Sequence, residues 1–291
     1  PEFIDSKEVG FEASFLKNRI TLDATYYDQN NTNQIVSIRV PRSTGYTFAF
    51  VNAASFSNYG FETQLKVTPL VNLGEVNLNF NANYSYNSSE VLSIYQDLQE
   101  LSIGGYVMAA NQAVVGKPAF IFNASDYKRD NQGRVIVDRL TGYPIVDEVN
   151  KKFGRTMPMH IIGLNPSISW KGLTVSALFE YKGGHYAFNM IGNEMAWTGV
   201  SEITGINHRE RFVIPNSVYE DPNKKGTYIE NTNITVSDAQ DFFTGDSYRT
   251  VASNFITSAA TWRFREFSIT YDIPNSLISK QSLIQGISVG V

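Results

Sequence analysis

The sequence has no cysteine, few histidines and no long apolar run, and each absence excludes a class of protein. Without cysteine there is no thiol catalysis, no disulfide bond and no thiolate metal site. No run approaches the roughly 18 apolar residues of a transmembrane helix, so we do not expect a protein that crosses a membrane with helices. The net charge of −4 argues against nucleic acid as a partner, because nucleic-acid-binding domains carry a basic patch.

Catalytic and metal-binding motifs are scarce as well. The three histidines, His160, His185 and His208, lie far apart without the spacing of metal ligands, and neither a phosphate loop nor a nucleophile elbow occurs. The stretch that begins at Asp126 has the acids and the glycine of a calcium loop, but Lys128 stands where an oxygen donor is needed. We therefore expect no enzymatic activity, no metal site and no cofactor.

Strict alternation of apolar and polar residues is the main positive signal. In "VNLNFNANYSY", residues 76–86, every second residue is apolar or aromatic, and asparagine or serine stands between. Such a pattern predicts a β-strand with two unlike faces. The pattern recurs in eight segments, near 6–16, 19–29, 57–69, 74–86, 160–170, 172–182, 261–273 and 283–291. The sequence therefore predicts an all-β protein with an antiparallel sheet.

The connections between these segments alternate between short and long. Short ones are expected at 17–19, 69–74, 171–172 and 274–282, and long loops near 28–55, 87–159 and 183–253. All short turns would then lie at one end of the sheet and all long loops at the other. Short periplasmic turns and long extracellular loops are typical of bacterial outer-membrane barrels, as are alternating segments of about ten residues. We therefore interpret the chain as a transmembrane β-barrel segment.

A membrane barrel would divide the side chains between lipid and lumen. Hydrocarbon would contact the apolar side chains, and a water-filled lumen the polar ones. The residues expected to face lipid include Phe11, Leu78, Phe80, Val175, Phe179 and Ile269. Those expected to face the lumen include Glu12, Glu62, Gln64, Lys66, Asn77, Asn79, Asn81, Asn83 and Glu180. Charged lumen residues suit a wide barrel better than an eight-stranded one, whose interior is filled by side chains.

Several stretches resemble the SusC/RagA family of TonB-dependent outer-membrane transporters. They are "SKEVGFEASFLKNRITLDATYYDQNNTNQI", "VPRSTGY" followed by "NAASFSNYGFETQL", "KRDNQGRVIVDRLTGYPI" and "FREFSITYDIPNSLI". Two departures from the family pattern are Ala54, where glycine is usual, and Leu173 after Trp170-Lys171-Gly172, where phenylalanine is usual. The motifs cover most of the chain in family order.

This resemblance implies about eight consecutive strands from the later part of a 22-stranded plugged barrel, with the final strand and the plug missing. It implies import of an oligosaccharide or a peptide across the outer membrane of a Gram-negative bacterium. The implied partners are a SusD-like surface lipoprotein, outer-membrane lipid, and the TonB complex acting through the plug. Because a partial sheet leaves two unpaired edges, we expect order only beside the rest of the barrel, or with the edges held by barrel-assembly machinery.

Ligand contacts are expected on the long loops, because aromatic platforms combined with charged hydrogen-bonding groups hold sugars and peptides. The candidates are Tyr46, Phe48, Phe50, Tyr106, Tyr186, Trp197, Arg209 and Arg211. The same aromatic residues could instead pack the loops together. The spacing of Leu92, Tyr95, Leu98 and Leu101 predicts a short amphipathic helix over 91–104, serving as a lid or as loop packing.

Two other architectures remain open from the sequence. A self-contained eight-stranded outer-membrane barrel, acting as an adhesin or structural protein, would require the first strand to pair with the eighth. A soluble carbohydrate-binding β-sandwich would require the apolar faces to pack against a second sheet.

Overall fold

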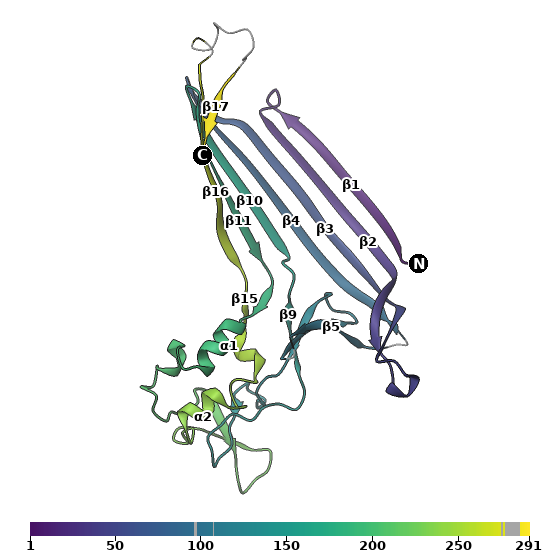
Figure 1. The fold of residues 1–291 in the computed structure, drawn as a ribbon, viewed down its shortest axis with the longest axis vertical. Helices are drawn as coiled ribbons and strands as arrows, with labels where there is room; N and C mark the ends of the chain where they lie inside the picture. Colours follow the sequence, from purple (N-terminus) through teal and green to yellow (C-terminus); the bar gives the residue numbers. More distant parts are fainter. Residues whose placement is uncertain (96–97, 107, 275, 277–285) are drawn as a thin grey trace.

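The computed structural model describes residues 1–291 except 96–97, 107, 275 and 277–285. Its main element is a sheet of eight antiparallel strands in the order β1-β2-β3-β4-β10-β11-β16-β17 (Figure 1). The strands are β1 (Phe3–Phe15), β2 (Ile20–Arg39), β3 (Phe48–Leu73), β4 (Val76–Ile94), β10 (His160–Trp170), β11 (Leu173–Gly183), β16 (Thr261–Asp272) and β17 (Ser288–Gly290). This confirms the predicted all-β antiparallel fold.

The sheet is open in the described part of the chain. β1 and β17 lie at its opposite edges, and no pairing joins them. The self-contained eight-stranded barrel is therefore wrong for this chain. The last predicted strand, near 283–291, lies partly outside the described residues, and β17 covers only its end.

Short turns connect the strands at one end of the sheet, at the top of Figure 1. Lys171 and Gly172 both have positive φ, of 47° and 85°, which is the backbone of the two-residue hairpin turns that match strand twist. In the first turn, Leu16, Lys17 and Asn18 also have positive φ. The long connections leave the opposite end.

The register carries the apolar residues of successive strands into common rows. One row joins Phe11, Ala24, Thr63, Tyr84, Ile162, Tyr181 and Trp262. The next joins Ala13, Leu22, Leu65, Ala82, Leu164, Phe179 and Phe264. Because alternate side chains point to opposite faces, one face of the sheet is mostly apolar and the other mostly polar, with Thr63 on the first and Ile161 and Leu178 on the second as exceptions.

A β-bulge in β16 keeps this face continuous. Trp262 and Phe264 occupy even positions, whereas Phe267 and Ile269 occupy odd ones. The register shifts between Leu178 and Phe179 of β11, so that one extra residue of β16, Arg265, is inserted. One inserted residue reverses the alternation, and both halves of β16 therefore present their apolar side chains on the same face.

Three strands continue well past the predicted loop boundaries. The loop expected near 28–55 is a hairpin extension in which β2 runs to Arg39 and β3 begins at Phe48. β4 runs to Ile94, inside the loop expected near 87–159. The predicted helix over 91–104 is wrong, since 91–94 belong to β4 and β5 (Glu100–Tyr106) follows. Val91 and Ile94 are buried against Ala113. Ala113 lies on β6, the strand that pairs with β5.

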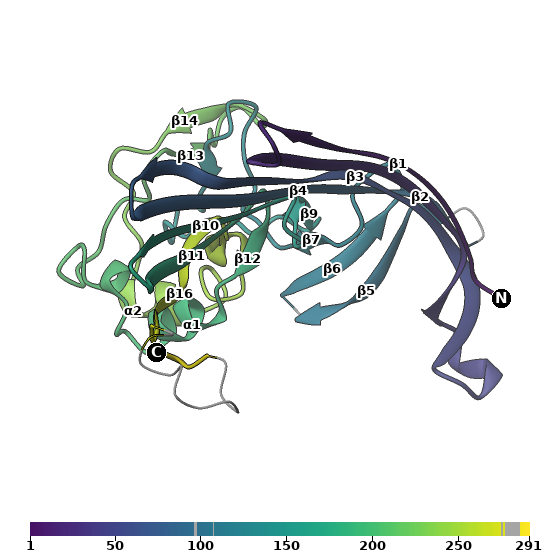
Figure 2. The ribbon, with the colours of Figure 1, turned by 90° about the horizontal axis from the view of Figure 1, so that it is seen from above.

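The other long connections fold into a layer of small elements. One sheet contains β5, β6 (Ala109–Val114), β7 (Ile121–Ala124) and β9 (Lys151–Arg155), and another contains β14 (Tyr228–Glu230), β13 (Ser217–Glu220) and β8 (Val135–Ile136). The layer also includes the pair of β12 (Tyr186–Phe188) and β15 (Ile256–Ser258), helices α1 (Met190–Trp197) and α2 (Ala239–Thr244), and 3-10 turns at Glu202–Thr204 and Ala252–Phe255. A further 3-10 turn, Arg42–Thr44, lies at the tip of the β2–β3 hairpin. Seen from above, the large sheet bends into an arc with β5, β6 and β9 inside it (Figure 2).

The hydrophobic core lies in this loop layer. The buried clusters centre on Phe122 and Ala252, on Val137 and Val251, and on Phe242 and Phe243. Apart from Val91 and Ile94 in the extension of β4, Val67 is the one buried apolar side chain among the described residues of the eight-stranded sheet. None of the helices in the described ranges is long and apolar enough to cross a membrane.

Candidate functional site

The two faces of the sheet separate the residues that the sequence assigns to lipid and to lumen. Phe11, Leu78, Phe80, Val175, Phe179 and Ile269 share the apolar face. Glu12, Glu62, Gln64, Lys66, Asn77, Asn79, Asn81, Asn83 and Glu180 share the polar face. Phe11 is 58% exposed and Phe264 is 62% exposed, so no second sheet covers the apolar face at these residues. The sandwich interpretation is therefore wrong.

Side chains on the polar face bond to one another across strands. The hydroxyls of Ser176 and Ser268 lie 2.7 Å apart, and those of Ser169 and Thr174 lie 3.0 Å apart. Such hydroxyl pairs are usual cross-strand contacts of a hydrated sheet face. Within β11, Glu180 also forms an ion pair with Lys182, with 3.5 Å between Oε1 and Nζ.

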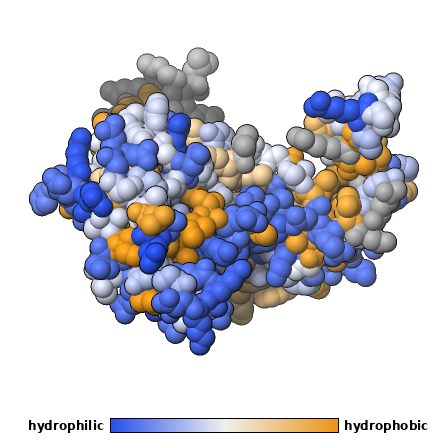
Figure 3. Space-filling view, turned by 90° about the horizontal axis from the view of Figure 1, so that it is seen from below, coloured by the Kyte–Doolittle hydropathy of each residue, from blue (hydrophilic) through white to orange (hydrophobic). Residues whose placement is uncertain are grey.

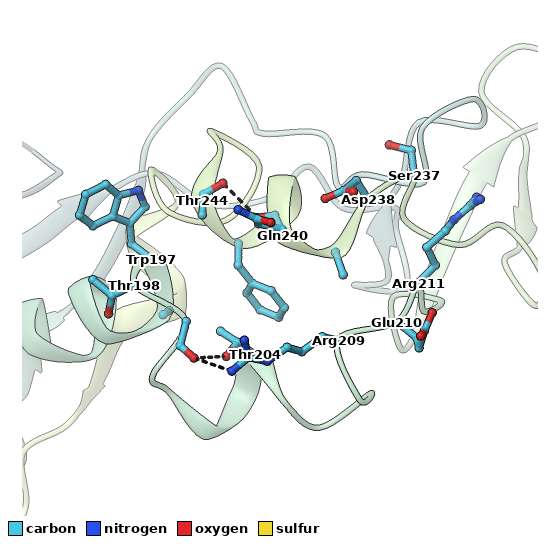
Figure 4. Close-up of a pocket in the computed structure, with 14 residues that line it drawn as sticks. Trp197, Thr198, Thr204, Arg209, Glu210, Arg211, Ser237, Asp238, Gln240 and Thr244 are labelled. Carbon is cyan, nitrogen blue, oxygen red and sulfur yellow. Dashed lines mark hydrogen bonds between the residues drawn. The ribbon is translucent and has the colours of Figure 1, made fainter.

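A cavity of about 490 Å³ opens in the loop layer, and it brings three of the predicted ligand residues together (Figure 4). Trp197 ends α1, and Arg209 and Arg211 follow the 3-10 turn at Glu202–Thr204. Helix α2 supplies the opposite wall with Gln240, Phe243 and Thr244.

Capping contacts fix the two helices beside the cavity. The side chain of Asn189 accepts a hydrogen bond from the Gly192 N–H at the start of α1, over 2.8 Å. Asp238 does the same for α2, accepting from the Asp241 N–H over 2.7 Å. Side-chain acceptors at this position satisfy helix N–H groups that have no intrahelical partner.

Trp197 is held by Arg249 from a distant part of the chain. The Arg249 guanidinium lies 4.4 Å from the centre of the indole ring, within the range of a cation–π contact. Its Nη2 also lies 3.3 Å from Oε1 of Glu194. Asn193, one turn earlier on α1, donates to the Arg249 carbonyl over 2.8 Å. This hydrogen bond holds the backbone of Arg249 against α1.

Within the described part of the chain, the side-chain hydrogen bonds of the two cavity arginines go to backbone carbonyls. Arg209 donates from Nη2 to the Gly199 carbonyl over 3.3 Å, and Arg211 donates from Nε to the Val236 carbonyl over 2.9 Å. Neither forms an ion pair with a residue that the structure describes. Each guanidinium has five N–H donors, so both retain donors for a carboxylate or a hydroxyl.

A second, apolar cavity of about 330 Å³ shares Phe243 with the first as a lining residue. Tyr127, Ile206, Phe212 and Tyr248 contribute to its lining. Burial raises the pKa of Tyr127 above its ordinary value, and likewise that of Tyr248. Both phenols are therefore neutral at physiological pH, and the Tyr127 hydroxyl already accepts from Asn254 over 2.7 Å.

The remaining predicted ligand residues lie elsewhere. Tyr46, Phe48 and Phe50 are on the projecting β2–β3 hairpin, Tyr106 stacks on Phe188 with 5.6 Å between ring centres, and the Tyr186 ring packs against Gly154. Sequence reasoning missed the contribution of α2 altogether. The signal was present in Asp238, Asp241 and Gly245, which are an N-cap, an acid in the first turn and a terminal glycine.

Residues 1–189 match the family model described as "TonB dependent receptor-like, beta-barrel". The chain belongs to this family. The family match covers all of β1–β4, β10 and β11. Barrels of TonB-dependent receptors are outer-membrane proteins of Gram-negative bacteria.

Two TonB-dependent receptors of Formosa agariphila are similar in sequence. TonB-dependent receptor P26 is 22% identical in an alignment of 210 residues that covers 65% of this chain and 21% of that protein. TonB-dependent receptor P39 is 25% identical over 105 residues, which are 36% of this chain and 10% of that protein. The chain thus spans about a fifth of the length of the first relative.

Solved structures share the fold of this TonB-dependent receptor segment. The RagAB peptide transporter aligns with 100% of the chain at a TM-score of 0.71, with 18% identity and coverage of 32% of that chain. The RagAB peptide importer in its "open-open" state aligns with 98% of the chain, at a TM-score of 0.68 and 18% identity, covering 30% of that chain. These likenesses extend the barrel fold beyond residue 189, to the loop layer and β16.

Proposed function

We propose that this chain forms wall and outer loops of a TonB-dependent outer-membrane receptor that imports a peptide or an oligosaccharide with a SusD-like surface lipoprotein. The observation that carries the proposal is the register of the eight-stranded sheet, which places apolar side chains on one face and polar ones on the other. Family membership supports the same conclusion.

The height of the apolar face fits a bilayer. On β4 this face runs from Val76 to Tyr86, and beyond Tyr86 the same face carries Ser88. Ten residues at ~3.4 Å each span ~34 Å along the strand. At a tilt of ~40° this becomes ~26 Å along the barrel axis, close to the ~25 Å apolar band of outer-membrane barrels.

Aromatic residues gather at both limits of this band. Trp170 and Tyr271 lie at the short-turn end, in the row that contains Val76. Tyr26, Phe61 and Tyr86 lie at the loop end, in one row. Two aromatic girdles are expected where a barrel wall meets the two membrane–water interfaces. We therefore assign the apolar face to lipid and the polar face to the lumen.

The open edges favour a wall that continues through other strands. The polar face carries Glu12, Glu62, Lys66 and Glu180, which need a hydrated interior wider than eight strands enclose. In a barrel of about 22 strands that lumen would hold a plug, through which TonB would drive uptake. Until the other strands close the barrel, barrel-assembly machinery would cover the two unpaired edges of the sheet.

The loop layer supports a partner on the outside. In the view from the loop side, orange apolar areas interrupt a largely hydrophilic surface (Figure 3). The exposed apolar side chains of the layer include Ile191 at 73%, Val200 at 68% and Ile206 at 60%. Exposed apolar groups rimmed by polar ones mark protein contacts. A lipoprotein lid over the barrel mouth would cover them, and RagAB is a transporter of peptides with this barrel fold.

Spin labelling tests the assignment of the faces. These residues contain no cysteine, so single cysteines at Val175, Ser176, Phe179 and Glu180 of β11 can be labelled in the full-length receptor in nanodiscs. We expect collisions with oxygen at Val175 and Phe179, and with a water-soluble nickel chelate at Ser176 and Glu180. Equal access of the chelate to all four labels would refute the proposal. Growth of a receptor deletion strain on peptides and on oligosaccharides as sole nutrients then identifies the cargo class.

A further inference from the structure

We infer that the loop cavity beside Trp197 is a binding site for a carboxylate of the imported molecule, with Arg209 and Arg211 as its anion-binding groups. The inference rests on the proposed function and names the chemistry that the site recognises. A carboxylate can come from an acidic or C-terminal residue of a peptide, or from a uronate of an oligosaccharide.

Ion pairing divides the arginines of the loop layer into two groups, and the cavity arginines belong, with Arg139 and Arg155, to the group without an ion pair among the described residues. Arg129, Arg134 and Arg249 are each ion-paired, with Asp126, Asp130 and Glu194 respectively. Arg209 and Arg211 are exposed and have no acidic partner among the described residues. Guanidinium groups with free N–H donors at a concave surface suit the planar geometry of a carboxylate.

The acids near the cavity are directed away from the arginines or are already bonded. Asp238 accepts from the first turn of α2 and thus acts as its N-cap. The side chains of Glu210 and Arg211 point in opposite directions from neighbouring positions of the chain (Figure 4). The two guanidinium groups lie apart in the cavity (Figure 4), and an incoming carboxylate would meet either of them without displacing an internal ion pair.

A tight turn orients Arg209. His208 and Arg209 are its two central residues, with φ of 53° and 63°, and the Glu210 N–H closes the turn by donating to the Asn207 carbonyl over 2.9 Å. Turns with two central residues at positive φ favour glycine or asparagine at those positions. Glycine would relieve the backbone, but it would remove the guanidinium that this bend directs toward Gly199 and the cavity.

Trp197 adds a flat apolar surface at one end of the cavity, and Arg211 lies at the other end (Figure 4). Arg249 fixes the indole from one side, and the residue remains 43% exposed. A rigid indole can contact the apolar face of a sugar ring or the side chain of a peptide residue. The cavity thus combines a charged end with an apolar platform.

Binding to the full-length receptor tests the inference. Four probes separate charge from source: trigalacturonate, its neutral counterpart maltotriose, an acidic tetrapeptide, and the same peptide with its carboxylates amidated. We expect a charged probe to bind and its neutral counterpart to bind at least tenfold more weakly. Raising the salt concentration from about 50 mM to about 500 mM should weaken binding of the charged probe, because salt screens its attraction to the guanidinium groups.

Variants identify the binding groups. Arg209→Gln and Arg211→Gln should each weaken binding of the charged probe about tenfold or more, since a hydrogen bond to a charged group is lost. Arg209→Lys should retain part of the affinity. Arg139→Gln, which removes an exposed loop arginine from a different concavity, is the matched control and should bind as the wild type does.

Each outcome decides the inference separately from the proposed function. Preference for trigalacturonate identifies a uronate source, and preference for the acidic peptide a peptide source. Equal affinity for neutral and charged probes, no binding of either charged probe, or unchanged binding by both Gln variants would overturn the inference. The spin-label pattern on β11 would be unaffected by any of these results, so the transport proposal stands or falls on its own test.

Discussion

An arginine placed at three positions of β3 should have three different effects on stability. Leu65 lies on the apolar face in the row of Ala82, Leu73 lies on the same face in the row of Val76, and Gln64 lies on the polar face. All three belong to one strand and are far from the loop cavity. The series Leu65→Arg, Leu73→Arg and Gln64→Arg therefore varies face and depth while the substituted residue type stays the same.

The register gives the depth of each position. The rows of Leu65 and Leu73 are six residues apart on β4, or ~20 Å along the strand and ~15 Å along an axis tilted by ~40°. The row of Leu65 is four residues from that of Tyr86, or ~10 Å along the axis. Leu65 is thus near the bilayer midplane and Leu73 near an interface.

Arginine facing lipid costs ~2–4 kcal/mol at the midplane and ~0–1 kcal/mol near an interface. An exposed polar-face substitution changes stability by about 0.5 kcal/mol or less. We expect Leu65→Arg to be the least stable variant, by about 1–4 kcal/mol relative to Leu73→Arg.

Thermal unfolding of the full-length receptor in nanodiscs measures the order of stabilities. The folded fraction that remains at each temperature is seen as the compact, fast-migrating band on a gel whose samples are not boiled. Leu65→Arg should unfold at the lowest temperature, with Leu73→Arg and Gln64→Arg close to the wild type. A Gln64→Arg variant as unstable as Leu65→Arg, or equal effects at Leu65 and Leu73, would refute the two-faced membrane wall.

Three further predictions concern local structure. Gly60→Ala should destabilise the wall by about 1–3 kcal/mol, because a Cβ would overlap the Tyr86 carbonyl oxygen and lie 2.7 Å from the Tyr27 hydroxyl. Unfolding of the receptor in nanodiscs measures this loss of stability. Gly205→Ala, whose Cβ would make only ordinary contacts, is the control. The backbone N–H of Thr141 holds the pKa of Asp138 below its ordinary value of 3.8. The Asp138 carboxylate therefore stabilises the loop above pH 3.8, and this stabilisation disappears as the pH falls further. The rate of proteolysis of Asp138→Asn should differ from that of the wild type at pH 7 and converge with it in acid. Asp238→Ala should cost α2 ~1 kcal/mol, seen as faster amide exchange over residues 239–244 and not over α1.

The alternation of residues was sufficient to predict the wall, because a strand between lipid and water has one requirement for each face. Residues 76–86 satisfy it at every position, and their neighbours across the sheet do so in register. The β16 bulge was harder to anticipate, since Arg265 interrupts the alternation in a manner that resembles a strand end. The partner strand, and not the local sequence, decides that the chain continues.

Outside the membrane band, the sequence was less informative because neither face meets a uniform solvent. β2 and β3 extend through mixed residues to Arg39 and Phe48, where the pattern alone predicts a loop. The helical spacing over 91–104 failed for a related reason. Four apolar residues fit a helical period by coincidence, while Val91 and Ile94 find a better apolar environment against Ala113 as part of a strand.

The candidate site shows the same limit of local reasoning. Trp197, Arg209 and Arg211 were recognisable as residue types that hold ligands, and the structure places all three at one cavity. Tyr46 and Phe48 were equally plausible by type, yet they lie on a separate hairpin. What distinguishes the two groups is the packing of α2 and Arg249 against α1, a contact between segments some 50 residues apart that no local pattern encodes.

Two kinds of stabilisation thus meet in one chain. The wall buries almost nothing against itself. In the membrane arrangement that we propose, its apolar side chains would gain their transfer free energy from lipid, and its order would depend on the bilayer and on neighbouring strands. The loop layer has packed aromatic clusters such as Phe212, Phe242 and Phe243, and these need only water outside. Because the layer carries its own core, its cavity can be shaped independently of the wall. Changes of loop sequence can therefore alter the recognised ligand while the alternation that the membrane demands is preserved.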